Sequence, residues 1–230
     1  MKTIGLIGGM SWESSIEYYR ILNETVKEKL GGLHSAKCVL YSVDFAEIEV
    51  LQHQGRWEEA GQQLSTVAQN LEKAGADFVL ICTNTMHKLA DEIQANLNIP
   101  LLHITDATAQ EIGKLGIKKV GLLGTRFTME EDFYKGRLRD KHGYTIIIPE
   151  ADERETIHRV IYDELVLGVI RPESKGKYLQ IVDWLVQAGA EGIIMGCTEI
   201  GLLIQQEDSH VPLFDTTRIH AEAAVEYAIG

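Results

Sequence analysis

The sequence contains little cysteine and no metal-binding pattern. Its 230 residues include three cysteines, Cys38, Cys82 and Cys197. An odd number of cysteines, with no C-x-x-C pair and no Cys/His cluster of zinc spacing, argues against a disulfide framework and a structural metal. We therefore expect reduced thiols, no bound metal and a reducing, cytoplasmic setting.

Long hydrophobic runs are also missing. No apolar stretch approaches the roughly 20 residues that span a bilayer. The first nine residues, MKTIGLIGG, are too short and too interrupted by glycine for the apolar core of a signal peptide. We expect no association with a membrane.

Positive charge is scarce, with 22 Lys and Arg residues against 34 Asp and Glu residues and a net charge of −12. Nucleic-acid binding needs a basic surface, so this balance argues against a nucleic-acid partner. It also means that local cations and helix N-termini must hold any anionic ligand against the overall charge.

The chain does contain a regular alternation of strand and helix patterns. Apolar strands are predicted at 2–8, 37–43, 78–82 and 101–103, and helices from Ser11 towards Lys29, at 57–73, and after Thr85 through Ile93. Strands that alternate with helices over such distances predict βαβ units and parallel sheets.

Three landmarks recur in the second half of the chain. Val120–Gly124 repeats Ile4–Gly8 at an offset of 116, Ala188–Ala190 repeats Ala74–Ala76 at 114, and Pro212–Phe214 repeats Pro100–Leu102 at 112. Similar landmarks in the same order at a nearly constant offset predict an internal duplication.

The duplication predicts an α/β fold of two similar Rossmann-like domains with parallel sheets and a cleft between them. We expect the first domain to comprise residues 1–98 plus 208–230, with the C-terminal helix packing back on it. The second domain is expected to comprise residues 99–207.

The predicted functional centre is Cys197. The apolar run Ile193–Gly196 ends immediately before it, and a helical pattern follows. This places the thiol at the carboxyl edge of a parallel sheet, where open α/β sheets bind ligands. Free amides at the head of the next helix are expected to favour a thiolate.

The offset of 114 aligns Cys197 with Thr83. A thiol from one half and a hydroxyl from the other are then expected on facing walls of the cleft. Cys82, one residue earlier along an extended chain, should point to the other side and into the core.

Two groups on opposite faces of a bound carbon suit stereochemical inversion, because one removes a proton and the other delivers one. The carbanion-like intermediate needs hydrogen-bond donors, and backbone amides around Gly8–Met10, Asn84–Thr85 and Gly124–Thr125 are candidates. The first glycine turn does not match the G-x-G-x-x-G motif, and no Asp or Glu that could bind a ribose hydroxyl follows it at a suitable distance. Both observations argue against a nucleotide cofactor.

Two motifs resemble the paired signatures of the cofactor-independent aspartate/glutamate racemase family: Ile81–His87 (ICTNTMH) and Ile193–Leu203 (IIMGCTEIGLL). The loops Gly8–Trp12, Gly124–Thr128 and Asp215–Thr217 also resemble that family, so the likeness covers essentially the whole chain. It implies two Rossmann-like domains, an active site between them, often a homodimer, and racemisation by paired cysteines without pyridoxal phosphate.

The sequence departs from the family pattern at Thr83, which stands where the family has its first cysteine. A threonine hydroxyl is too weak an acid to become a resting base, although it can donate or relay a hydrogen bond. Cys197 is then the one good base. In related two-cysteine enzymes the second-half cysteine serves the L-enantiomer, so the resemblance implies a preference for L-aspartate or L-glutamate.

We expect the substrate, an acidic amino acid, to contact residues that flank these positions in both halves. Gln52 is included by analogy with the family, Arg126 as a partner for a side-chain carboxylate, and Glu199 because it can orient Cys197. The full set is Met10, Gln52, Asn84, Thr85, Thr125, Arg126, Thr128, Thr198 and Glu199. Weaker candidates are His53, Arg56, His87, Lys88 and Arg171, and His220 is expected to be structural.

Two other functions fit the same residues. One is a binding protein that holds an acidic metabolite without turnover, and the other is a related decarboxylase or cis-trans isomerase that uses the single cysteine. Incorporation of solvent deuterium at Cα separates a racemase from a binding protein, because a binding protein exchanges nothing.

Overall fold

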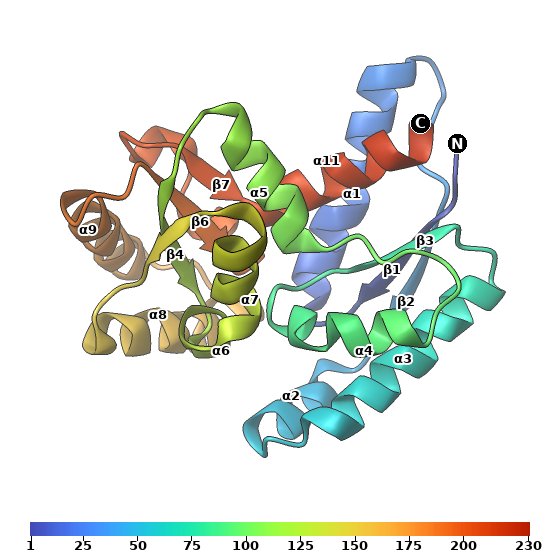
Figure 1. Cartoon of the computed structure of the whole chain (residues 1–230), viewed down its shortest axis with the longest axis horizontal. Helices are drawn as coiled ribbons and strands as arrows, with labels where there is room; N and C mark the ends of the chain where they lie inside the picture. Colours follow the sequence, from blue (N-terminus) through green and yellow to red (C-terminus); the bar gives the residue numbers. More distant parts are fainter. The chain divides into compact units, whose positions relative to one another are not determined.

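A computed structural model describes all 230 residues, and the chain divides into two compact units (Figure 1). Unit 1 comprises Met1–Ile104 and His220–Gly230, and unit 2 comprises Thr105–Ile219.

Unit 1 is built on a parallel sheet of three strands, β1 (Ile4–Gly8), β2 (Cys38–Ser42) and β3 (Phe78–Ile81), in the order β2-β1-β3. Leu101 forms an isolated parallel bridge with Val79 and so extends the sheet beyond β3. The sheet is covered on both faces, which explains why β1 and β3 are apolar throughout.

Alternation of side chains along the strands separates two cores in unit 1. Ile7, Val79 and Ile81 pack against α2 (Phe45–His53), α3 (Trp57–Lys73) and α4 (Ala90–Ala95). Ile4, Leu6, Phe78 and Leu80 pack on the other face with residues of α1 (Trp12–Leu30) and of the C-terminal helix α11 (Thr216–Ile229). Figure 1 shows these two helix layers on either side of β1 and β3.

Unit 2 contains a parallel sheet of four strands in the order β5-β4-β6-β7. The strands are β4 (Lys119–Gly124), β5 (Thr145–Ile147), β6 (Gly192–Gly196) and β7 (Leu213–Asp215). The helices are α5 (Ile104–Lys114), α6 (Arg126–Glu130), α7 (Asp132–Gly136), α8 (Ala151–Asp163), α9 (Pro172–Gln187) and α10 (Ile200–Leu203). Short turns at Thr85–Leu89, Arg137–Lys141, Leu165–Leu167 and Gln206–Asp208 complete the two units.

Equivalent residues of the two halves are paired in the two sheets, as expected for a duplication. Ile4 pairs with Phe78 in unit 1, and Val120 pairs with Gly192 in unit 2, so the partners keep the offsets of 116 and 114. The pairs Val79–Leu101 and Ile193–Leu213 likewise keep 114 and 112. The predicted fold of two related α/β units with parallel sheets is therefore confirmed.

The boundaries between the units differ from the predicted division over residues 99–104 and 208–219. Strand pairing gives the reason. Leu101 bonds to Val79 in the first sheet, whereas β7 bonds to β6 in the second. Only the later part of α11, from His220, belongs to unit 1, where Ala221, Ala224, Val225 and Ala228 pack against Ile4 and Leu6.

Two local features were not predicted. Gln52 and His53 lie in a separate helix, α2, whose N-cap is Asp44. The N-cap of α6 is Thr125, whose hydroxyl accepts the Thr128 amide at 3.3 Å. Helix α1 begins after its N-cap Ser11, as predicted.

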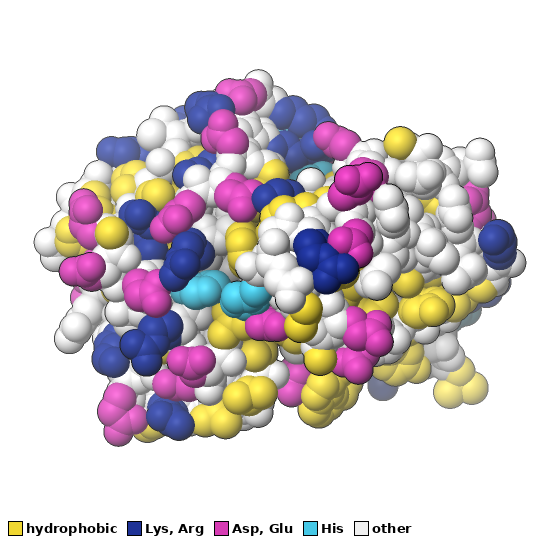
Figure 2. Space-filling view, turned by 90° about the horizontal axis from the view of Figure 1, so that it is seen from below, with side chains coloured by type: hydrophobic (Ala, Val, Ile, Leu, Met, Phe, Trp, Pro, Cys, Tyr) yellow, Lys and Arg dark blue, Asp and Glu magenta, His cyan; other side chains and the backbone are white.

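Acidic and basic side chains are interspersed on the surface drawn in Figure 2. Many form exposed pairs along a helix, such as Arg20 with Glu17 and Glu24. No helix combines the length and the apolar character that crossing a membrane requires.

His220 is completely buried in unit 1 between two polar partners. Its Nε2 donates to the Leu102 carbonyl at 2.9 Å, and the Tyr18 hydroxyl lies 2.8 Å from Nδ1. Burial lowers the pKa of this imidazole from its usual 6.5 to about 4.

This pKa predicts that acid destabilises the fold. As the pH falls below 6.5 the unfolded chain binds a proton at His220 while the folded chain does not, so stability is lost between pH 6.5 and about 4. The loss from this group amounts to about 3 kcal/mol. Urea unfolding at pH 7 and pH 4 should show a smaller loss in His220→Gln than in the wild type. The exposed His210→Gln serves as control, and an identical loss in all three proteins would contradict the assignment.

Candidate active site

Cys197 follows β6 directly, at the carboxyl edge of the unit 2 sheet. Its side chain is only 8% exposed. The sulfur donates to Glu199 Oε2 at 2.9 Å, and the Thr198 hydroxyl donates to the same oxygen at 2.9 Å. Glu199 is itself buried, so the thiol and the carboxylate form a pair shielded from water.

The resting thiol is protonated. Burial raises the pKa of Cys197 well above its usual value, and the adjacent Glu199 carboxylate raises it further. The backbone amides of Thr198 and Glu199 do bond to the sulfur and lower the pKa, as expected for a strand-to-helix turn, but they do not outweigh burial. The amides thus act in the predicted direction, but burial and the Glu199 carboxylate keep the pKa of the thiol high. The helix that follows, α10, has only four residues and a correspondingly small dipole.

Polar side chains from neighbouring loops surround the end of β6. Thr216 donates to the Met195 carbonyl at 2.8 Å and Thr217 to the Thr198 carbonyl at 3.4 Å, which anchors the loop carrying Cys197 to the start of α11. Thr128 is buried, and its methyl carbon would lie 3.2 Å from a Cβ placed on Gly196, which shows that Thr128 packs closely against the end of β6. Thr125, at the end of β4, lies 3.2 Å from Thr128 between their hydroxyl oxygens. The structure thus brings Thr125, Thr128, Thr198 and Glu199 to the same sheet edge as Cys197.

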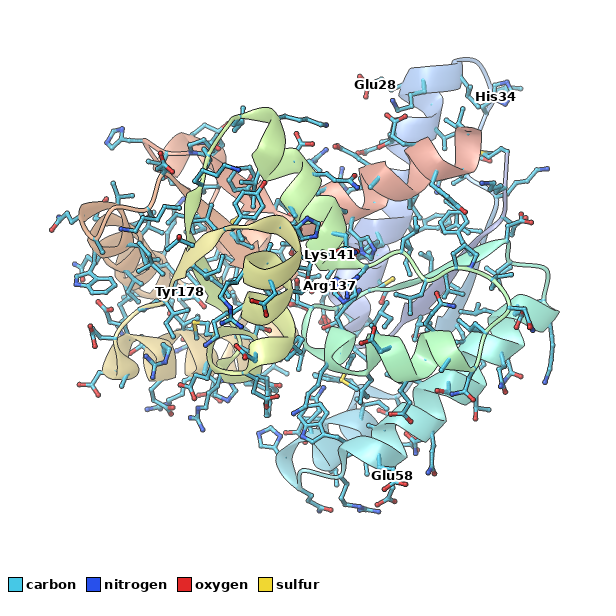
Figure 3. All side chains as sticks on the ribbon, in the orientation of Figure 1. Glu28, His34, Glu58, Arg137, Lys141 and Tyr178 are labelled. Carbon is cyan, nitrogen blue, oxygen red and sulfur yellow. The ribbon has the colours of Figure 1, made fainter.

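One further group near Cys197 was not predicted from the sequence. Burial raises the pKa of Tyr178, and Cys197, Glu164 and Glu199 raise it further, so the phenol lies within electrostatic range of each of these three residues. Tyr178 on α9 is fully buried and donates to the Ile157 carbonyl at 3.1 Å (Figure 3). The only signal in the sequence was a tyrosine at a buried position of an amphipathic helix.

The matching edge of unit 1 carries Thr83, Asn84 and Thr85 after β3. Thr83 is half-buried, while Asn84 and Thr85 are buried. Gln52 of α2 joins them, because its Nε2 lies 2.8 Å from the sulfur of Met86. The structure therefore brings Gln52 to the loop after β3.

The glycine turn after β1 holds Met10 against the core. Gly9 has φ of +91°, and a Cβ there would lie 2.2 Å from the Val43 carbonyl oxygen, so only glycine fits. Its amide donates to the Ser15 hydroxyl at 2.8 Å. Met10 is buried at the end of the turn, on the same edge of the unit 1 sheet as Thr83.

Cys82 behaves as core. It is fully buried with Ile4, Leu6 and Tyr18, and burial raises the pKa of its thiol far above the usual range. The prediction that Cys82 lies in the core is confirmed.

The family model for Asp/Glu/hydantoin racemases matches residues 7–224. The chain belongs to this family. The predicted enzyme class, an isomerase that needs no cofactor, is thereby confirmed.

Individual relatives of this racemase agree. A protein from Yersinia pestis proposed to be an Asp/Glu racemase has a crystal structure that is 56% identical, with all of both chains covered and a TM-score of 0.93. An aspartate racemase homologue from Pyrococcus horikoshii is 37% identical with the same coverage and a TM-score of 0.87. The broad specificity amino-acid racemase RacX of Bacillus subtilis is 28% identical over 165 residues, 69% of this chain and 67% of its own.

The basic residues considered as substrate contacts pair with other side chains of the protein. Arg126 is half-exposed and pairs with Glu155. Arg56 pairs with Glu59, and Lys88 lies over the Trp57 ring at 4.0 Å. Two further cations, Arg137 and Lys141, lie together in Figure 3, and both bond to Asp106 at 2.7 Å. His53 pairs with Glu49, and Arg171 lies 3.8 Å from Glu164.

The pairing of Cys197 with Glu199 makes a prediction about Glu199→Gln. Removing the negative charge should lower the pKa of the Cys197 thiol, which can be followed by thiolate absorbance or by the pH profile of alkylation. Exposed Glu207→Gln is the control and should leave the profile unchanged. An unaltered thiol pKa in folded Glu199→Gln would show that the carboxylate does not control the thiol.

Proposed function

We propose that the protein racemises acidic amino acids, with Cys197 as the base that removes the α-proton from L-aspartate or L-glutamate. The observation that carries this proposal is the buried hydrogen bond from the Cys197 thiol to Glu199 at the carboxyl end of β6. A thiol alone at this place would be inert, whereas a thiol with a built-in proton acceptor can be activated when substrate binds.

The proposed sequence of proton transfers starts at this pair. Glu199 accepts the thiol proton, and the resulting thiolate removes the α-proton of the substrate. Substrate binding favours the transfer because it brings the positive α-ammonium group of the amino acid towards the sulfur, and a nearby positive charge stabilises a thiolate. Inversion is completed when the opposite face of Cα receives a proton from the Thr83 hydroxyl, which is replenished from water. Glu199 then releases its proton to water, so one proton is taken up and one is released in each turnover.

Carboxylate recognition is assigned to hydrogen-bond donors rather than to a dedicated cation, because Arg126 already pairs with Glu155. The donors proposed for the α-carboxylate and the developing negative charge are the amides and hydroxyls of Asn84, Thr85, Thr125, Thr128 and Thr198. Met10 and Gln52 would shape the side of the site that unit 1 provides.

We also propose a homodimer, which would cover an exposed apolar face on α1. Trp12, Ile16 and Tyr19 are 61%, 53% and 54% exposed, and their spacing places them on one side of the helix. Contiguous exposed apolar side chains of this size mark interaction surfaces. A second copy is the occupant that fits the family, since a two-fold axis buries the same stripe on both chains.

A reducing, cytoplasmic setting is proposed from the chemistry. Cys197 has to remain a thiol to act as a base, and all three cysteines are unpaired.

The racemase proposal predicts deuterium incorporation at Cα when the wild type is incubated with L-aspartate or L-glutamate in D₂O. Cys197→Ala should lose this exchange at least about a hundredfold, since the group proposed to take the α-proton is removed. Cys82→Ala should retain it and lose mainly stability. Absence of exchange with the wild type would favour a binding protein, and equal loss in both variants would contradict the assignment of Cys197.

Thr83→Cys places a thiol at the proposed second proton-transfer position and should speed the D-to-L direction, since each 1.4 kcal/mol of barrier is worth roughly tenfold in rate. The final mixture must stay the same, because a catalyst changes only barriers. Chiral chromatography from pure D-aspartate and pure D-glutamate measures the rates. No gain with either, in a folded variant, would mean that Thr83 does not act on that face.

The dimer proposal predicts that Ile16→Glu shifts the protein to monomer in sedimentation equilibrium, because it buries a charge in the apolar face. The control is Leu115→Glu, since Leu115 is also exposed but lies in unit 2. A monomeric wild type, or a dimer that survives Ile16→Glu, would contradict the proposal.

A further inference from the structure

Unit 1 contains a buried cluster of three histidines that the proposed proton transfers do not use. His87, His103 and His220 are all buried. The ring centroids of His87 and His103 lie 4.6 Å apart, and those of His87 and His220 lie 5.7 Å apart. Three titratable rings packed together in a core are costly unless each has defined hydrogen-bond partners.

His87 bonds to two backbone groups that are distant in sequence. Its Nδ1 lies 2.8 Å from the Thr83 carbonyl oxygen, and the Ile104 amide donates to its Nε2 at 3.1 Å. A carbonyl can only accept and an amide N–H can only donate, so His87 is the neutral tautomer with its proton on Nδ1. A cationic imidazole would turn a second donor towards the Ile104 amide.

The histidines bond to residues at the two points where the chain crosses between the units. Ile104 is the last residue before unit 2, and His220 is the first residue after it. His220 in turn donates to the Leu102 carbonyl and contacts the Tyr18 hydroxyl. The imidazoles of His87 and His220 thus fasten both crossing points, and His87 fastens the loop of Thr83 to one of them.

We infer that His87 is a positioning residue for Thr83. Its two hydrogen bonds hold the backbone of Thr83 at a fixed position relative to the backbone of Ile104. A bond from a histidine to the carbonyl four residues earlier is a common local feature. The second bond, to an amide 17 residues further on, makes His87 a link between the Thr83 loop and a segment outside its own helix. Because the hydroxyl of Thr83 moves with its backbone, the bonds of His87 determine the position from which the hydroxyl returns a proton to the substrate. The inference rests on the proposed role of Thr83.

The geometry explains why a histidine is used. A lysine or arginine has no acceptor for the Ile104 amide, and an aliphatic side chain has neither donor nor acceptor. Asparagine places its NH₂ group close to where Nδ1 lies but does not reach the second partner. Phenylalanine keeps the ring shape within the cluster and removes both bonds.

The test uses the ratio of D-enantiomer formed to deuterium incorporated into the remaining L-enantiomer when L-glutamate or L-aspartate is incubated in D₂O. The L-enantiomer gains deuterium only when Cys197 returns it to the face from which it was removed, whereas the D-enantiomer forms only by delivery at the Thr83 face. The ratio therefore reports on delivery at that face. We expect His87→Phe to lower the ratio by about tenfold to a hundredfold with exchange largely retained, since a displacement of about 1 Å can cost that much. His87→Asn, which can keep the bond to the Thr83 carbonyl but not the one to the Ile104 amide, should recover little of the loss. His34→Phe, at the exposed site that Figure 3 shows after the end of α1, is the control.

A wild-type ratio in folded His87→Phe overturns the inference, as does loss of the ratio in the His34 control alone. If His87→Phe does not fold, His87→Gln, which moves the amide away from the Nδ1 position, takes its place with the same expectation.

Hydrogen exchange at the Ile104 amide gives a readout that does not depend on catalysis. Faster exchange in His87→Phe than in the wild type supports the link, and equal exchange overturns it. A wild type that incorporates no deuterium into substrate would count against the proposed function, while the Ile104 amide would still decide whether His87 holds the two segments together.

Discussion

The chemistry assigned to this racemase depends on one buried contact, the hydrogen bond from the Cys197 thiol to the Glu199 carboxylate. Removing both groups from water keeps the thiol protonated at rest, because burial and a neighbouring negative charge both disfavour a thiolate. In the proposed mechanism the same contact supplies the acceptor for the thiol proton when substrate binds. A protonated resting thiol also resists oxidation and alkylation, since the thiolate is the reactive form.

The second constraint is the duplicated backbone. Equivalent strand registers in the two units place Thr83 and Cys197 at equivalent ends of β3 and β6. The two halves then differ in chemistry but not in architecture. Unit 2 surrounds its residue with a carboxylate and hydroxyls, whereas unit 1 anchors the backbone of Thr83 through His87. Under the proposed roles, unit 2 moves the α-proton and unit 1 holds a weaker donor in place.

Periodicity and repetition made the fold predictable from the sequence. Apolar runs interrupted by glycine predicted the strands. The offsets of 116, 114 and 112 predicted the duplication, and equivalent residues pair in the two sheets at the same offsets. The position of Cys197 and the burial of Cys82 followed from the same reasoning. The thiol pKa did not, since it depends on burial and on the rotamer of Glu199, which no local pattern encodes. Helix α2, the role of Thr125 as cap, the ion pair of Arg126 and the histidine cluster also depend on tertiary contacts.

The measurement that most directly tests the central claim is a crystal structure with L-aspartate or L-glutamate bound to Cys197→Ser, a variant that retains the shape of the site but lacks the base. The account predicts that the substrate Cα lies between the residue 197 side chain and the Thr83 hydroxyl, on opposite faces and within about 3–4 Å of each, with the α-carboxylate held by backbone amides and threonine hydroxyls. An amino acid bound with both residues on the same face of Cα, or at a site that Thr83 does not reach, would contradict it.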